Sequence, residues 1–185
     1  MAYSEYLHSA YARTRALGIP AETIRHGAGP IPVETLFDAV GGLADLTRQL
    51  AKGISTSSTC DVALECATVS VAAKPRFERA IQREIVLTLG SAEYQGIPIL
   101  SADIEDIQEI RRRANYHVWW SLGAGQIVDM TLMVHLALLK NATPPRILPI
   151  IGSPDDIPQI KWRPYLVGSA VLEALTSEPY PVLAR

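Results

Sequence analysis

The chain has 185 residues, of which 48% are hydrophobic and 19% are charged, and its formal net charge is −2. This composition is that of a globular protein and argues against a disordered chain. Its basic residues form no run longer than Arg111–Arg113 and do not interleave with aromatic ones, which excludes the usual nucleic-acid footprint. We expect one domain over residues 1–185, able to bury roughly 70% of the surface of the unfolded chain.

The sequence contains two cysteines, Cys60 and Cys66, which are too few for a disulfide framework. Reduced thiols and a cytoplasmic location are the simpler expectation. The N-terminus has no signal-peptide pattern, and the apolar run 130–139 is too short to cross a bilayer. We therefore expect no membrane association, while export by a signal-independent route stays open, as does the oligomeric state.

Helical spacing of apolar residues predicts two helices in an N-terminal part, residues 1–52. The first covers residues 5–17 and ends at Gly18-Ile19-Pro20. The second covers residues 33–50, with Gly41-Gly42 marking a kink.

A catalytic core is expected over residues 53–135. Ser58 or Thr59 can cap a helix over residues 60–73, which Lys74-Pro75 would close. Because this helix is small or apolar almost all round, it should be buried against a sheet.

The remaining elements alternate between strands and helices. We expect a strand at 83–89, a turn at 90–96, and either a short helix or a solvated loop at 101–113. A hairpin follows at 116–131. A C-terminal part, residues 136–185, would wrap the surface, with an edge strand at 146–151 and a helix at 164–175. This order predicts an α+β domain with an antiparallel sheet.

The hairpin carries a histidine and an aspartate whose side chains should meet. With a three-residue loop, at 122–124 or 123–125, His117 lies opposite Asp129 or opposite Thr131. In both registers His117 and Asp129 face the same side of the sheet, because side chains alternate along a strand. A carboxylate beside an imidazole fixes its tautomer and makes it a stronger base.

The missing nucleophile is expected to be Cys60. At a helix N-terminus the free N–H groups and the macrodipole favour a thiolate and can stabilise an oxyanion. Cys66 would lie nearly two turns inside the same helix, as a small buried hydrophobic residue. The order Cys60, His117, Asp129 follows the logic of thiol proteases.

These elements resemble the transglutaminase-like branch of the papain-like cysteine protease superfamily. Its members carry a helix-initiating cysteine, then an H-x-W strand and a D-x-T strand, which residues 117–119 and 129–131 match. The resemblance covers roughly residues 57–132. It implies a central helix packed on an antiparallel sheet, here with extra N-terminal helices. It also implies a triad of the nucleophile Cys60, the general base and acid His117, and the orienting Asp129.

The expected activity is acyl transfer through a thioester, on a protein, peptide or other amide, by a peptidase, amidase, deamidase or transglutaminase. Trp119 shares the face of His117 and would shield the site or line an acyl pocket. No cofactor is expected. A metal site formed by the triad residues with His135 is not supported, because no zinc-binding spacing occurs. The alternative is a non-catalytic binding or scaffold domain on the same fold.

Overall fold

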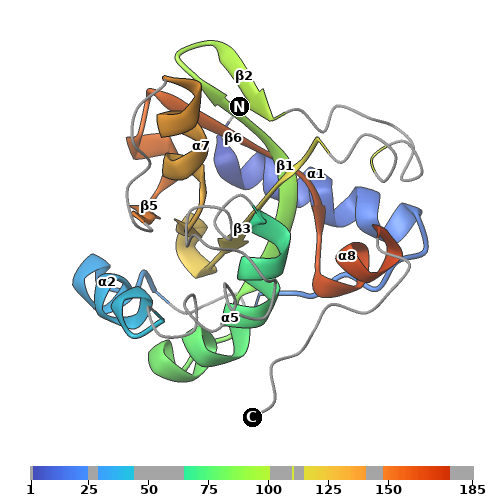
Figure 1. The fold of residues 1–185 in the computed structure, drawn as a ribbon. Coiled ribbons are helices and arrows are strands. Elements are labelled where there is room, and N and C mark those ends of the chain that lie inside the picture. The colour runs from blue at the N-terminus through green and yellow to red at the C-terminus, as the bar shows by residue number, and fades with distance from the viewer. Residues whose placement is uncertain are drawn as a thin grey trace, which may run out of the picture.

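The computed structural model describes residues 2–24, 29–43, 65–100, 110, 115–140 and 148–175, and it has α+β architecture (Figure 1). Its helices are α1 (Tyr3–Ala16), α2 (Val33–Gly41), α5 (Cys66–Ile81), α7 (Leu132–Leu139) and α8 (Ser169–Leu175). Its strands are β1 (Val86–Tyr94), β2 (Ile97–Leu100), β3 (His117–Ser121), β4 (Ile127–Asp129), β5 (Ile150–Gly152) and β6 (Ile160–Val167). Short 3-10 turns lie at Gly123–Gly125 and Pro154–Asp156.

All the strand pairs are antiparallel, as the sequence predicts. The sheet order is β2-β1-β3-β4-β5, and β6 also pairs with β1. The predicted edge strand at 146–151 corresponds to β5, which ends this order. Strand β1 is the organising element, because it hydrogen-bonds to β2, β3 and β6.

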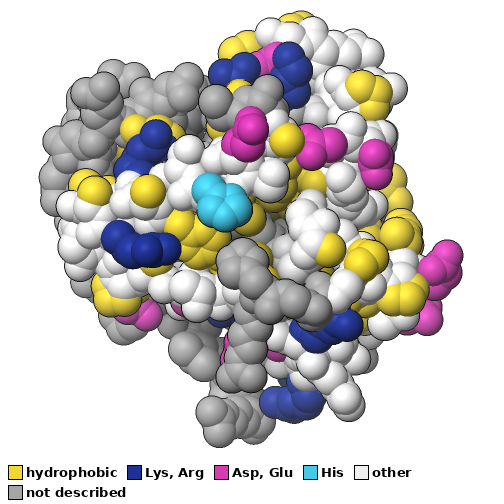
Figure 2. All heavy atoms as spheres, turned by 180° about the vertical axis from the view of Figure 1, so that it is seen from behind, with side chains coloured by type: hydrophobic (Ala, Val, Ile, Leu, Met, Phe, Trp, Pro, Cys, Tyr) yellow, Lys and Arg dark blue, Asp and Glu magenta, His cyan; other side chains and the backbone are white. Residues whose placement is uncertain are grey.

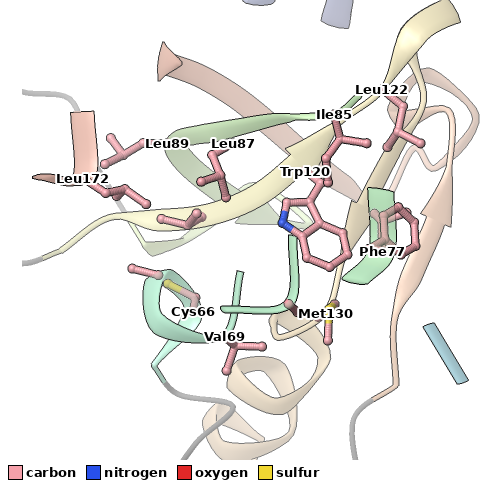
Figure 3. Packing of buried hydrophobic residues seen from close by; sticks show 14 of the residues in the cluster. Cys66, Val69, Phe77, Ile85, Leu87, Leu89, Trp120, Leu122, Met130 and Leu172 are labelled. Atoms are coloured by element: carbon pink, nitrogen blue, oxygen red, sulfur yellow. The ribbon is translucent and has the colours of Figure 1, made fainter. Parts of the chain in front are cut away.

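Helices cover both faces of the sheet (Figure 1). On one face, α5 packs against β3 through a core that includes Phe77, Leu87 and Trp120 (Figure 3). On the other face, α1 packs against β6, and Trp119 and Trp162 belong to this second core. The alternation of Trp119 and Trp120 thus divides two adjacent indoles between two hydrophobic layers.

Helix α5 differs from its prediction at both ends. It begins at Cys66 rather than at Cys60, and it continues through Pro75 to Ile81. A proline inside a helix removes one backbone hydrogen bond, but here Phe77, completely buried on the following turn, holds the helix against the sheet. The predicted stop at Lys74-Pro75 is therefore wrong, because tertiary burial outweighs the local signal.

The boundaries of other elements also differ from the predicted ones. The turn predicted to start at Gly90 begins only after Tyr94, so Gly90 lies inside β1. The second hairpin strand ends at Asp129 and gives way to α7. Residues 164–167, predicted as the start of the last helix, belong to β6. Helix α1 is confirmed, and α2 ends at the predicted kink. The structure does not describe residues 44–64 or, apart from Ile110, residues 101–114.

Gly90 is required by the packing around it. A Cβ atom there would lie 2.1 Å from the backbone oxygen of Arg163 and 2.7 Å from Cη2 of Trp119. Since a backbone atom cannot move aside cheaply, we expect Gly90→Ala to lower the free energy of unfolding by about 2–3 kcal/mol. Gly41→Ala is the control, because nothing lies within 4 Å of its added atom. Chemical denaturation measures both, and equal stabilities would contradict this account.

Charged side chains of both signs are interspersed with hydrophobic ones over the face seen in Figure 2. No helix among the described residues has both the length and the apolar character that crossing a bilayer requires.

Candidate active site

The loop of the β3–β4 hairpin fixes which side chains share a face. Trp120 pairs with Val128 and Ser121 pairs with Ile127, which is the register predicted for a three-residue loop at Gly123–Gly125. Gly125 in this loop has a φ of +72°, a value that glycine adopts without strain.

In this register His117 and Asp129 form a buried pair. His117 Nε2 lies 2.7 Å from Asp129 Oδ2, and both side chains have an exposed fraction of 0%. The contact predicted from strand parity is therefore present in the fold.

Asp129 accepts hydrogen bonds at both oxygens. Oδ2 receives the indole N–H of Trp162 at 2.8 Å in addition to His117. Oδ1 receives the backbone N–H groups of Thr131 and Leu132, at 3.2 and 3.0 Å, where α7 begins. A buried carboxylate with this many donors is stabilised as an anion and fixed in orientation.

The two groups shift each other's pKa in opposite directions. Burial lowers the pKa of His117, but the charge of Asp129, their hydrogen bond and the Cys66 side chain outweigh burial and raise it well above its ordinary value. Burial raises the pKa of Asp129, but the charge and hydrogen bond of His117, with the Trp162 and Leu132 N–H groups, hold it below its usual range. Both shifts favour the charged forms of the pair, an imidazolium and a carboxylate.

Among the described residues, the cysteine nearest in the fold to this pair is Cys66, and the prediction that it lies inside the helix is wrong. Cys66 is the first residue of α5 (Figure 3). Its Sγ lies 3.9 Å from the carbonyl oxygen of Tyr116, next to His117, and the Cys66 side chain adds to the raised pKa of His117. Cys60, predicted as the nucleophile, lies outside the described residues.

The second nitrogen of the imidazole is unused. Among the described residues, the buried side-chain atoms without a hydrogen-bond partner are His117 Nδ1 and Thr131 Oγ1. Because buried polar atoms are usually paired, these two atoms are exceptions in the cores of the protein.

Trp119 packs behind the imidazole. Its ring stacks on His117 with centroids 5.8 Å apart, and its exposed fraction is 0%. Its indole N–H donates to the Tyr3 hydroxyl, which lies 2.6 Å from Ser121 Oγ. Trp119 thus shares the face of His117, as predicted, but it supports the imidazole from inside the core instead of lining an open acyl pocket.

His135 on α7 lies on another side of His117. Their rings meet edge to face with centroids 5.8 Å apart. Burial and the His117 charge lower the pKa of His135, so it stays neutral beside the imidazolium. It also lines a surface depression of about 260 Å³ with Ile99, Leu138 and Leu139. The structure places His135 on α7, a helix that the sequence did not predict.

Asp129 is poorly placed to bind a metal ion, because both of its carboxylate oxygens already accept hydrogen bonds from N–H groups. No group of three or more metal-ligating side chains comes together in the described part of the chain.

Cys66 thus begins α5 beside the residue that precedes His117, and the His117 imidazole contacts the Asp129 carboxylate at the end of β4. Comparison of the chain with known protein families, with curated proteins and with solved structures finds no match.

Proposed function

We propose that this protein catalyses cysteine-dependent acyl transfer through a thioester intermediate. Cys66 is the nucleophile, His117 the general base and acid, and Asp129 the residue that orients the imidazole. This keeps the type of chemistry and two of the three residues predicted from the sequence, and replaces Cys60 with Cys66.

The observation that carries the proposal is the state of the two ring nitrogens of His117. Nε2 is held by Asp129, whereas Nδ1 has no hydrogen-bond partner of regular geometry in the described part of the chain, and the Cys66 side chain adds to the raised pKa of the ring. Nδ1 is the ring nitrogen closer to the backbone, and the sulfur lies next to the backbone oxygen of the preceding residue, Tyr116. We infer that Nδ1 is the atom that exchanges a proton with the thiol.

The start of α5 supplies a second part of the chemistry. The first N–H groups of a helix have no partner within the helix, and Glu65 gives this one no side-chain cap. These groups and the macrodipole favour negative charge on the sulfur and on a carbonyl oxygen under attack.

The reaction follows from these roles. The sulfur anion of Cys66 adds to an amide or ester carbonyl, and the negative charge moves to its oxygen. When the C–N or C–O bond breaks, the His117 imidazolium gives its proton to the leaving group, which leaves a thioester on Cys66. Water or an amine then attacks the thioester, His117 takes up the proton, and the thiolate returns as leaving group.

The H-x-W and D-x-T elements at residues 117–119 and 129–131 support a protein or peptide amide as the substrate class, through their resemblance to transglutaminase-like enzymes. Hydrolysis, deamidation and transfer to an amine all use this intermediate. The acceptor that resolves it decides among them.

The rival is a scaffold domain without activity. One observation favours it, namely that Cys66 is only 6% exposed and packs within the core cluster of α5. In that case the thiol would be a small core residue and the His117–Asp129 pair a structural ion pair.

Alkylation of the full chain distinguishes the cysteine enzyme from the scaffold domain. We expect iodoacetamide at about pH 6 to modify Cys66 at least tenfold faster than an ordinary thiol, because only a thiolate reacts appreciably there. His117→Gln should slow this reaction on the order of 100-fold, since an unassisted thiol is less than about 1% ionised at that pH. Peptide mapping by mass spectrometry measures the rates at Cys60 and Cys66 separately.

Slow labelling of both cysteines, unchanged by His117→Gln, would support the scaffold. Fast labelling of Cys60 that depends on His117 would contradict Cys66 as nucleophile and restore the original assignment. As a check on chemistry, an activated ester should leave an acyl group on Cys66 in the wild-type chain and none in Cys66→Ser.

A further inference from the structure

Trp162 lies at the far side of the proposed triad, on a strand that the sequence did not predict. Its indole N–H donates to Asp129 Oδ2 at 2.8 Å, and Trp162 is 2% exposed. The same oxygen accepts a hydrogen bond from His117 Nε2 at 2.7 Å. One buried oxygen therefore joins the proposed general base to an indole on β6.

Small residues on β1 make this contact possible. Trp162 pairs with Ala92, and His117 pairs with Gly90 two residues earlier on the same face. The Trp119 ring occupies the space that a side chain at Gly90 would fill, and Ala92 shares a core cluster with Trp119 and Trp162. A larger residue at Gly90 would collide with the Trp119 ring and with the Arg163 backbone oxygen.

We propose that Trp162 is a positioning residue, which fixes the carboxylate of Asp129 in the orientation that His117 requires. This inference rests on the proposed function and adds a fourth residue to its machinery. Its hydrogen bond goes to Asp129, so it would act on His117 through that carboxylate.

The geometry explains what the indole adds. Backbone N–H groups hold Oδ1 from the α7 side. Without a second donor at Oδ2, the carboxylate could tilt about its terminal torsion while keeping those bonds, and the bond to His117 would lengthen. A weaker Asp129–His117 bond stabilises the imidazolium less, so fewer molecules hold the imidazolium–thiolate pair.

The test is Trp162→Phe in the full chain carrying Cys60→Ser, so that Cys66 is the single thiol. Phenylalanine keeps an aromatic ring and removes the donor. Alkylation of Cys66 is measured from about pH 5 to pH 9. We expect the rate at about pH 6 to fall roughly tenfold, as the profile moves about one unit to higher pH, and the rates to converge where every thiol is ionised.

Trp120→Phe is the matched control. Its indole N–H donates to the Ser70 carbonyl oxygen at 3.0 Å, and Trp120 is completely buried on the opposite face of the sheet. This variant loses stability in a comparable way, but it should keep the parent pH profile. A profile of Trp162→Phe that coincides with the parent, or shifts no more than that of Trp120→Phe, would overturn the proposal.

His117→Gln in the same background distinguishes a failure of the proposed function from a failure of the role proposed for Trp162. If it leaves the profile unchanged, the proposed function itself fails. If it shifts the profile and Trp162→Phe does not, only the role of Trp162 fails.

Should Trp162→Phe not fold, NMR of the parent chain decides. A hydrogen bond to a carboxylate moves the indole N–H resonance of Trp162 downfield, and Asp129→Asn should reverse most of that shift. A resonance that stays in place in Asp129→Asn would overturn the proposal.

Discussion

Asp129→Ala is expected to lower the free energy of unfolding by about 3–5 kcal/mol, because it leaves a buried imidazolium without its counterion. It also removes the acceptor for the Trp162 indole and for two backbone N–H groups at the start of α7. Unsatisfied buried donors add to the cost. Urea denaturation followed by the tryptophan fluorescence of the chain measures the change.

Asp129→Asn and Asp155→Ala are the controls. Asparagine keeps the shape and still accepts hydrogen bonds at one oxygen, so it should cost less than alanine. Asp155 accepts a single backbone N–H, that of Tyr3, from an exposed position, and its loss should cost about 1 kcal/mol or less. Similar losses for Asp129→Ala and Asp155→Ala would show that the buried pair contributes little.

The pH dependence of stability should reflect the His117–Asp129 pair. Asp129 raises the pKa of His117, so the folded chain keeps a proton that the unfolded chain loses above the ordinary value of 6.5. Stability should therefore fall by up to about 1.4 kcal/mol per pH unit as the pH rises above 6.5, relative to His117→Gln/Asp129→Asn.

The acid side follows from Asp129. Because the pKa of this carboxylate is lowered on folding, its contribution is complete above its ordinary value of 3.8 and is lost as the pH falls further. Between about pH 5 and pH 6 neither His117 nor Asp129 makes the stability depend on pH, so the free energies of unfolding of the variants are best compared there.

The amino-acid sequence by itself predicted the hairpin and, for a three-residue loop, the shared face of His117 and Asp129, while it left the pairing register open between two loops. Alternation along residues 117–121 and 127–129, with a glycine-bearing loop between them, placed His117 and Asp129 on one face, because a side-chain period of two leaves no other choice once the loop length is set. The α+β class followed from the same local patterns, since helical and strand periods differ.

Only the tertiary structure decided where α5 begins, which sets Cys66 beside the strand of His117, and which indole holds the aspartate. The start of α5 was misplaced because Thr59 is a good capping residue and Glu65 is a poor one, whereas packing against β3 selects a helix that begins at Cys66. Trp162 could not be found from local spacing, because it reaches Asp129 from β6, 33 positions along the chain. Contacts between such distant residues depend on the order of strands in the sheet, which no local periodicity encodes.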